Sequence, residues 1–221
     1  MFSRLVKIVN DSLPLFIKRT YITRKNREEL QEYWRAPYDG KNIPSEYLKD
    51  RERSIFLLNL AKRYIEEGQK VLEIGCNVGR NLNELFLSGF YDLSGVEISK
   101  NAVEMMRKAY PDMAGKIKIY NGAVESFIED FKDNSFDLVF TMAVLEHIPT
   151  ESEFIFSHMA RIAKKNLITI EDERGLSWRH FPRNYKKIFE KLGLKQIQEI
   201  SLRDVRVPGL SSNFVARVFK K

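Results

Sequence analysis

Short apolar runs alternate with segments of helical periodicity from Lys70 to the end of the chain, and this alternation constrains the fold more than any other feature. The apolar runs have the length of β-strands and occupy residues 70–74, 93–98, 116–120, 136–141, 166–170, 196–202 and 213–219. Helical patterns separate the first six of these runs, at residues 79–88, 100–110, 123–130, 151–163 and 183–192. Strands that alternate with helices form right-handed βαβ units. The sequence therefore predicts an α/β fold with a doubly wound, mostly parallel, seven-stranded sheet.

Residues at the boundaries of these segments refine the predicted topology. The loop between the last two apolar runs contains Pro208-Gly209 and no helical pattern, so we expect an antiparallel hairpin at one edge of the sheet. Ser88-Gly89 is expected to end the first helix, because glycine readily adopts the left-handed conformation of a helix C-terminus. Thr150-Glu-Ser-Glu153 has the spacing of a capping box and predicts a helix start. A further helix is predicted over about residues 46–66, ahead of the first strand.

The segment before the alternating pattern has a different character, so we divide the chain into an N-terminal helical extension, residues 1–45, and a domain, residues 46–221. Residues 1–25 hold six basic residues and one acidic residue. Their apolar side chains share one face of a helix that Pro14 would kink or divide, namely Phe2, Leu5, Val6, Val9, Leu13, Phe16 and Ile17. Such a segment either contacts an anionic membrane surface peripherally or packs on the domain or on a second subunit, and the sequence leaves both open.

Composition limits the remaining classes. With 221 residues, 43% of them hydrophobic and 30% charged, the chain can form one globular domain without covalent cross-links. A single cysteine excludes an internal disulfide framework and favours a reducing, cytoplasmic location. No apolar stretch approaches the roughly 18 residues that a membrane-spanning helix needs. Most of the net charge of +7 lies in the first 25 residues, which makes nucleic acid an unlikely partner for the domain.

The segment KVLEIGCNVGRNL, residues 70–82, has the form of a strand, a tight glycine turn and a helix start. Gly75 allows the turn, Gly79 lets the helix begin close to the sheet, and Asn77 can adopt positive φ in place of a glycine. A dinucleotide-binding fingerprint requires glycine where Asn77 and Arg80 stand, and no Gly-Lys-Ser/Thr follows as in a P-loop. These departures disfavour a nicotinamide-dependent dehydrogenase and a nucleoside triphosphatase.

An acidic residue ends the second predicted strand, LSGVEIS, residues 93–99. Glu97 lies 22 residues after Gly75, where a carboxylate can accept hydrogen bonds from both ribose hydroxyls of a nucleoside. Glu73, near the end of the first strand, is expected to face the same crevice. Two acids at the carboxyl ends of neighbouring strands suit a ligand with a positive centre better than a pyrophosphate.

Four segments together resemble the successive motifs of the class I S-adenosylmethionine-dependent methyltransferases. They are VLEIGCNVGRNL (71–82), LSGVEISKNAVEMM (93–106), IKIYNGAVESF (117–127) and FDLVFTMAVLEHIP (136–149). The resemblance covers roughly residues 50–200 and is closest to the small-molecule branch, whose fourth strand is followed by Leu-Glu-His-Ile-Pro. The first motif is also similar to bacterial methylases linked to surface sugars. The resemblance implies a Rossmann-like sheet, S-adenosylmethionine as the cofactor and S-adenosylhomocysteine as the product.

By position, the resemblance implies a cofactor site made of Glu73, Gly75, Asn77, Gly79, Glu97, Ile98, Ala123, Val124, Met142 and Ala143. The first four would surround the methionine moiety and ribose, and Glu97 would bind the ribose hydroxyls. The adenine would lie against Ile98 and along Ala123 and Val124. The family often has an acid before Ala123 for the adenine amino group, whereas this chain has Gly122. Adenine recognition then depends on backbone groups or on Glu125.

Methyl transfer from a sulfonium depends chiefly on positioning, so a dedicated base is optional. If the acceptor is a hydroxyl group, His147 and His180 are the candidate catalytic residues, because both are expected in loops at the mouth of the site. Some ubiquinone-type O-methyltransferases have a metal-binding acid where this chain has Ala143, so no metal site is predicted. The acids at residues 171–173 could rebuild an acidic site after the fifth strand, but we interpret them as a solvated strand end.

Aromatic and basic residues outside the cofactor motifs are candidates for acceptor binding. GLSWRHFPRNY, residues 175–185, offers Trp178 and Arg179, which suit an anionic or sugar-like acceptor or else pack on the N-terminal segment. Trp34 and Tyr38 could form the opposing wall or lid. We expect methyl transfer to a small-molecule or glycan-like acceptor, at oxygen. An RNA methyltransferase and a non-catalytic cofactor-binding or partner protein remain alternatives, and the sequence does not determine the oligomeric state.

Overall fold

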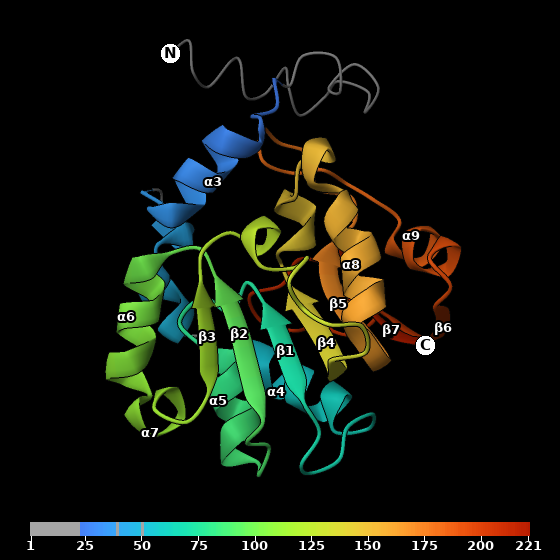
Figure 1. Cartoon of the computed structure of the whole chain (residues 1–221). Helices are drawn as coiled ribbons and strands as arrows, with labels where there is room; N and C mark the ends of the chain where they lie inside the picture. Colours follow the sequence, from blue (N-terminus) through green and yellow to red (C-terminus); the bar gives the residue numbers. More distant parts are fainter. Residues whose placement is uncertain (1–22, 39, 50) are drawn as a thin grey trace.

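The computed structural model describes residues 23–38, 40–49 and 51–221, and its centre is a seven-stranded sheet (Figure 1). The strands are β1 (Val71–Ile74), β2 (Leu93–Glu97), β3 (Lys118–Asn121), β4 (Phe136–Met142), β5 (Ala163–Asp172), β6 (Lys195–Ser201) and β7 (Phe214–Lys220). Their order is β3-β2-β1-β4-β5-β7-β6. All neighbours are parallel except β7, which is antiparallel to both β5 and β6. The predicted sheet and its C-terminal hairpin are confirmed.

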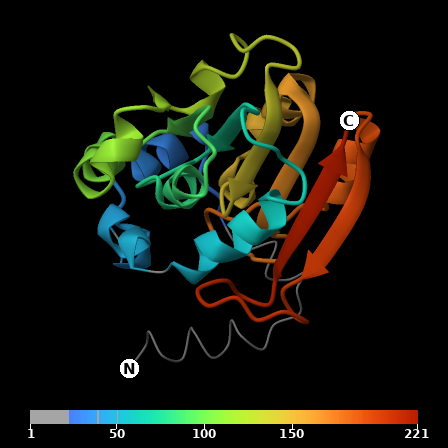
Figure 2. The ribbon, with the colours of Figure 1, turned by 90° about the horizontal axis from the view of Figure 1, so that it is seen from below.

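Helices cover both faces of the sheet. They are α3 (Arg27–Arg35), α4 (Glu52–Ala61), α5 (Arg80–Leu87), α6 (Lys100–Ala109), α7 (Pro111–Ala114), α8 (Phe154–Ile162) and α9 (Tyr185–Lys191). Buried apolar residues of α4 to α7 form one core with one face of the sheet, and those of α8 and α9 form a second core with the other face. The hairpin of β6 and β7 lies at the far end of the sheet from β3 (Figure 2).

The predicted helix boundaries need three corrections. The helix expected over 46–66 is a 3₁₀ turn, η2 (Pro44–Leu48), followed by the shorter α4. The helix expected over 123–130 is reduced to the 3₁₀ turn η3 (Val124–Ser126). The expected capping box does not form. Thr150 lies inside a 3₁₀ turn, η5 (Thr150–Ser152), and α8 begins at Phe154 without a side-chain cap.

Two local expectations are confirmed. Ser88 is the C-cap of α5, and Gly89 follows it with φ 93°. Asn77 has φ 47° and so takes the left-handed conformation that the glycine turn requires. The predicted amphipathic segment lies almost entirely outside the described residues. Within the described part of the chain, no helix has the length and apolar character needed to span a membrane.

The helix α3 is the part of the N-terminal region that reaches the site. Asn26 caps it, its side chain accepting from the Glu29 N–H while the Glu29 carboxylate accepts from the Asn26 N–H. Leu30 and Tyr33 are its buried residues. In Figure 1 the helix lies beyond the ends of the parallel strands toward which the arrows point. This placement puts α3 across the carboxyl ends of the strands, where ligands bind in open α/β sheets.

Candidate functional site

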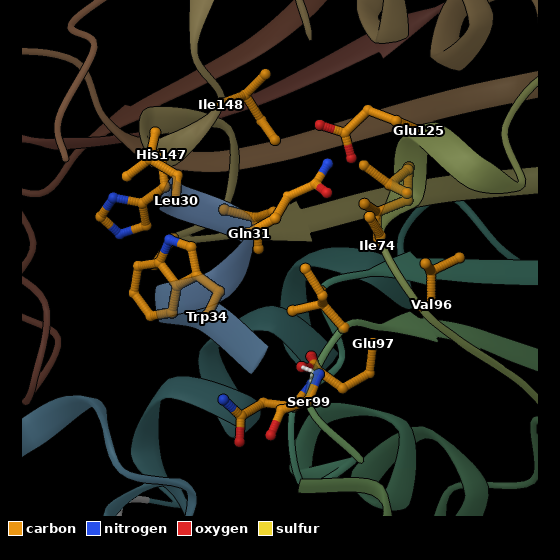
Figure 3. Close-up of a pocket in the computed structure, with 18 of the residues that line it drawn as sticks. Leu30, Gln31, Trp34, Ile74, Val96, Glu97, Ser99, Glu125, His147 and Ile148 are labelled. Carbon is orange, nitrogen blue, oxygen red and sulfur yellow. Dashed lines mark hydrogen bonds between the residues drawn. The ribbon is translucent and has the colours of Figure 1, made fainter. Parts of the chain in front are cut away.

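The strand order reverses between β1 and β4, and a pocket opens at the carboxyl ends of the strands around this point. The loops that follow β1, β2, β3 and β4 form one side of the pocket. The helix α3 and the turn η2 form the opposite side. Figure 3 shows Glu97 and Ser99 at one end of the pocket and Trp34 and His147 toward the other. A topological switch point of this kind is where doubly wound folds bind their ligands.

The end of the pocket near Glu97 is held together by backbone hydrogen bonds. Glu97 accepts from the Asn77 N–H through Oε2 and from the Ser99 N–H through Oε1, each at 2.7 Å. The N–H groups of Gly75 and Cys76 both donate to the carbonyl of Val96, at 2.8 and 3.0 Å. Burial raises the pKa of the Glu97 carboxyl to about 7, although the hydrogen bonds from the Asn77 and Ser99 N–H groups oppose this shift. The carboxylate is thus fixed in place, with oxygen lone pairs left to accept further bonds.

Most residues predicted to bind the cofactor line this pocket: Gly75, Asn77, Glu97, Ile98, Ala123, Val124, Met142 and Ala143. Glu73 and Gly79 do not. Glu73 is 1% exposed and accepts from the Asn81 side chain of α5 at 2.7 Å, so the expectation that it faces the crevice is wrong. Side chains alternate along a strand, and Glu73 lies on the face that α5 covers. Burial raises its pKa to about 8.

Gly79 acts on packing rather than as part of the pocket wall. Its φ is 72°, and a Cβ there would approach Cγ of Met106, on α6, to 2.7 Å. The absence of a side chain therefore lets the start of α5 pack closely against α6. Arg80, the next residue, donates from Nε to the Ser54 hydroxyl at 2.7 Å and from a terminal nitrogen to the Tyr47 carbonyl at 2.9 Å. Arg80 thus ties α5 to the turn that carries Tyr47, a residue of the pocket wall.

The other end of the pocket combines Trp34 of α3 with His147 of the short turn η4 (Leu145–His147), their ring centroids 4.7 Å apart. His147 Nδ1 lies 2.9 Å from the carbonyl oxygen of Arg179, and because a carbonyl can only accept, Nδ1 carries the proton. Burial, and then the neighbouring His180, lowers the pKa of His147 to about 3. His147 is therefore a neutral imidazole whose Nε2 has a free lone pair.

The segment after β5, which includes Trp178 and His180, packs against the residues of this end of the pocket. The rings of His180 and His147 lie 4.7 Å apart, and burial lowers the pKa of His180. Trp178 meets Tyr33 edge-on at 5.0 Å, and its carbonyl accepts from the Lys25 N–H at 3.1 Å. The predicted packing of this segment on the N-terminal region is confirmed. Of the four residues predicted to bind the acceptor, Trp34 lines the pocket, whereas Tyr38, Trp178 and Arg179 do not, and Tyr38 is 77% exposed.

The acids at the end of β5 are not a solvated strand end, which corrects the sequence-based interpretation. Glu171 is fully buried and accepts from the Thr141 hydroxyl at 2.7 Å and from the Val144 N–H at 2.9 Å. Asp172 is also buried and accepts from the Gly175 N–H at 2.6 Å. Glu173 forms an ion pair with Arg217 at 2.7 Å. β5 extends through Asp172 and lies between β4 and β7, so these acids are enclosed and shape the loops of the site. Burial raises the pKa of Glu171 to about 8.

Several residues of the pocket wall were not predicted as site residues: Arg27, Leu30, Gln31, Pro37, Pro44, Tyr47, Ser99, Gly122, Val144, Ile148 and Pro149. Those that follow β2, β3 and β4 could have been inferred from their position at strand ends. The residues of α3 carry no comparable signal, because an amphipathic helix does not reveal what its apolar face covers. Glu125, considered for adenine recognition, lines the pocket and accepts from the Ser152 hydroxyl at 2.7 Å.

Comparison with known proteins agrees with this arrangement. Residues 72–169 match the model of the family described as "Methyltransferase domain". The matched residues are a little under half of the chain, and the match supports the predicted class I S-adenosylmethionine-dependent methyltransferase domain. S-adenosylmethionine is the cofactor of this family of transferases, as the sequence predicts. Magnesium protoporphyrin IX methyltransferase from Synechocystis, solved with bound S-adenosylhomocysteine, has the same fold with a TM-score of 0.63, 16% identity, and coverage of 88% of this chain and 98% of that one.

Two curated relatives show how much of the chain is shared. Phosphoethanolamine N-methyltransferase 2 of Caenorhabditis elegans is 27% identical over 51% of this chain and 26% of its own length. The mitochondrial ubiquinone biosynthesis O-methyltransferase of Schizosaccharomyces pombe is 32% identical over 43% of this chain and 34% of its own length. The chain thus spans about a third or less of these relatives. Their names include both nitrogen and oxygen as the methylated atom.

Proposed function

We propose that this methyltransferase moves the methyl group of S-adenosylmethionine to a hydroxyl group of a small-molecule or sugar-like acceptor. The observation that carries the proposal is one continuous pocket at the switch point, with a fixed carboxylate at one end and an aromatic-imidazole wall at the other. The Glu97 carboxylate would accept hydrogen bonds from the ribose hydroxyls, and Trp34 and His147 would hold the acceptor. The donor and the acceptor would then meet near Met142 and Ala143, which also line the pocket.

The transfer itself is an in-line displacement. The acceptor oxygen forms a bond to the methyl carbon while the carbon–sulfur bond breaks, and the sulfonium becomes the neutral thioether of S-adenosylhomocysteine. Positioning of the two reactants can supply much of the rate acceleration. Because its pKa is about 3, His147 is a weak base, so we assign it to orientation of the acceptor hydroxyl rather than to full removal of the proton.

The helix α3 covers one side of the pocket, and this favours a small acceptor. The side chains of Leu30, Gln31 and Trp34 project from α3 toward the strand ends, as Figure 3 shows, and they line the pocket. We therefore assign the described part of residues 1–45 to a lid over the domain formed by residues 46–221. Under this lid the site admits a small molecule more readily than a folded nucleic acid. Arg27 adds a positive charge to the pocket wall, which suits an anionic or sugar-like acceptor.

The test is calorimetric titration with S-adenosylmethionine and S-adenosylhomocysteine, followed by incubation of the enzyme and methyl-labelled cofactor with fractionated cell extract. Glu97→Ala should weaken cofactor binding at least ~100-fold, because each ribose hydrogen bond to a charged acceptor contributes about 1.5–3 kcal/mol. Glu104→Ala is the matched control. Glu104 is an exposed acid of α6 that pairs with Lys100 at 3.9 Å, and its loss should leave the affinity unchanged.

The outcomes separate the candidate functions. Absence of any affinity for either ligand in the wild-type chain would refute the proposal. Cofactor binding without label transfer to any fraction would instead support a non-catalytic binding protein. Label recovered in small molecules supports the proposal, and the labelled atom, identified by mass spectrometry, tests the assignment to oxygen.

A further inference from the structure

Three side chains from two distant segments converge beside the acceptor end of the pocket. Glu146 and His147 belong to the turn after β4, and His180 belongs to the loop after β5. Oε1 of Glu146 lies 3.6 Å from Nε2 of His147 and 3.7 Å from Nε2 of His180. One possible metal-ligating atom from each residue lies within 4.8 Å of the other two, and no other group of this kind occurs among the described residues. The three side chains are at most 20% exposed.

Both imidazoles are held from behind through Nδ1. Nδ1 of His147 donates to the Arg179 carbonyl at 2.9 Å, and Nδ1 of His180 lies 2.6 Å from the Ser177 hydroxyl. An imidazole fixed at Nδ1 by a carbonyl or other oxygen presents the lone pair of Nε2 in a defined direction, which is the arrangement found around metal-bound histidines. The other oxygen of Glu146, Oε2, accepts from the Asp172 N–H, so the carboxylate is also held in one orientation.

The distances suit a small transition-metal ion. Bonds of about 2.0–2.1 Å in a tetrahedral site place neighbouring ligand atoms roughly 3.3 Å apart. The two measured distances to Glu146 Oε1 exceed this value by only a few tenths of an ångström. Two imidazole nitrogens and one carboxylate oxygen form the donor set of a zinc site with an open fourth position, and cobalt accepts the same ligands. Magnesium and calcium prefer oxygen ligands and fit this set poorly.

The local charges also favour a cation. Glu171 and Asp172 lie next to Glu146, and the carboxyls of Glu146 and Glu171 interact unfavourably with each other. Glu171 is not available as a ligand, because its oxygens accept from Thr141 and from backbone N–H groups. Arg179 is the opposing positive charge, and its guanidinium is directed to the rings of Trp178, Tyr33 and Trp34, at 5.5–6.0 Å from their centroids.

We propose that Glu146, His147 and His180 bind one divalent transition-metal ion of the zinc type at the acceptor end of the pocket. The sequence predicted no metal because Ala143 provides no ligand; the structure supplies His180 instead, from a segment more than thirty residues away. Of the three ligands, His147 lines the pocket. If the proposed function holds, it would place the ion beside the acceptor, whose oxygen would take the open fourth position. Coordination there would lower the pKa of a hydroxyl group. His147 would then act on the acceptor through the metal ion, because its Nε2 lone pair is used as a ligand.

The test measures metal binding directly, in the absence of cofactor and acceptor. Untagged full-length protein, dialysed against a chelator, is titrated with Co²⁺ and followed by visible absorption, and with Zn²⁺ by calorimetry. One equivalent should bind, with the intense absorption typical of low-coordinate Co²⁺. His180→Ala and Glu146→Gln should each weaken binding at least ~10-fold, and Ser177→Ala, which removes only the Nδ1 partner, should have a smaller effect of up to about 10-fold.

The chain offers a matched control for these variants. It contains three histidines and one cysteine, and the cysteine, Cys76, is buried. The third histidine, His158, lies on α8 and interacts with Arg161, so His158→Ala should bind the metal as the wild type does. Circular dichroism and thermal unfolding verify that each variant is folded. Glu146→Gln keeps the shape and the acceptor for the Asp172 N–H, so it is informative even if His180→Ala loosens the loop.

Two results would overturn the proposal: no saturable binding of Co²⁺ or Zn²⁺ by the wild type, or equal affinity after loss of His180 and of the Glu146 charge. The cofactor-site variant Glu97→Ala separates this proposal from the proposed function. It should lose affinity for S-adenosylmethionine but bind the metal normally, whereas His180→Ala should lose the metal.

Discussion

The two ends of the pocket are built in different ways. At the cofactor end, Glu97 is held by backbone N–H groups of Asn77 and Ser99, and all three residues lie within a stretch of 23 residues. At the acceptor end, Trp34, His147 and Arg179 come from three segments separated by more than 30 residues each. The first end is therefore defined by local turns, whereas the second depends on the packing of side chains from distant segments.

The contrast between the two ends indicates where specificity resides. Backbone groups hold Glu97 whatever side chains surround it, so the cofactor end can keep its geometry while the rest of the chain varies. The acceptor end consists of aromatic rings in contact, with Tyr33 at 4.9 Å from Trp34 and 5.0 Å from Trp178, and a substitution in any one segment alters its shape. The two ends touch at the loops after β1 and β4, where Gly75 packs on Val144.

The largest expected effect tests that contact. Gly75 has φ 74°, and a Cβ there would clash with the Cγ2 atom of Val144. Gly68 has φ 80°, and a Cβ added to it would meet no atom within 4 Å, so it is the matched control. Gly68→Ala should cost about 1–2 kcal/mol in free energy of unfolding, because of its left-handed conformation. Gly75→Ala should cost roughly 1–3 kcal/mol more, because the clash is added.

Urea unfolding of both variants and of the double variant Gly75→Ala with Val144→Ala measures this difference. The double variant should recover part of the additional loss, which shows that the two loops are coupled. Equal destabilisation by the two glycine substitutions would mean that the ends of the pocket do not constrain one another.

The second effect concerns pH and is confined to the cofactor end. In the free protein the pKa of Glu97 is about 7, so the carboxyl is mostly protonated at pH 6 and mostly ionised at pH 8. Ribose hydroxyls that donate to the carboxylate favour the ionised form, so cofactor binding should release a proton. Affinity for S-adenosylhomocysteine should therefore rise about 10-fold from pH 6 to pH 8.

Calorimetry at both pH values, in two buffers with different ionisation enthalpies, detects the affinity change and the released proton. Glu97→Gln should bind more weakly and lose most of the pH dependence. If the dependence persists in this variant, another group is responsible for it. A decrease in affinity with rising pH would contradict the predicted role of the carboxylate.

The smallest effect is expected at the acceptor end and concerns the local stability of α3. Trp178→Ala removes the edge-on contact with Tyr33, and such a pair contributes about 0.5–1.5 kcal/mol. Amide hydrogens of α3 should exchange up to about 10-fold faster, while cofactor affinity changes little. Tyr91→Ala removes a comparable edge-on pair with Phe86 and should leave exchange in α3 unchanged. Unaltered exchange in the Trp178 variant would show that this segment does not support the lid.

The sheet, its C-terminal hairpin and the local turn of the cofactor end could be predicted from the sequence. These parts depend on local features of the chain, namely strand periodicity, the turn at Gly75 and Asn77, and the spacing to Glu97. The interactions that form them are local as well. The sequence-based prediction misplaced Glu73, because a strand buried on both faces gives no alternation from which to infer which face a side chain occupies.

The acceptor end could not be predicted from the sequence. The burial of Glu171, the approach of His180 to Glu146 and the position of Trp34 over the strand ends all arise from packing between segments far apart in the chain. No periodicity encodes such encounters, because each segment is compatible with many partners until the whole core has formed. Arg80 illustrates what the sequence can and cannot predict. Its sequence position excludes a dinucleotide site, but its bonds to Ser54 and Tyr47 appear only once the chain has folded.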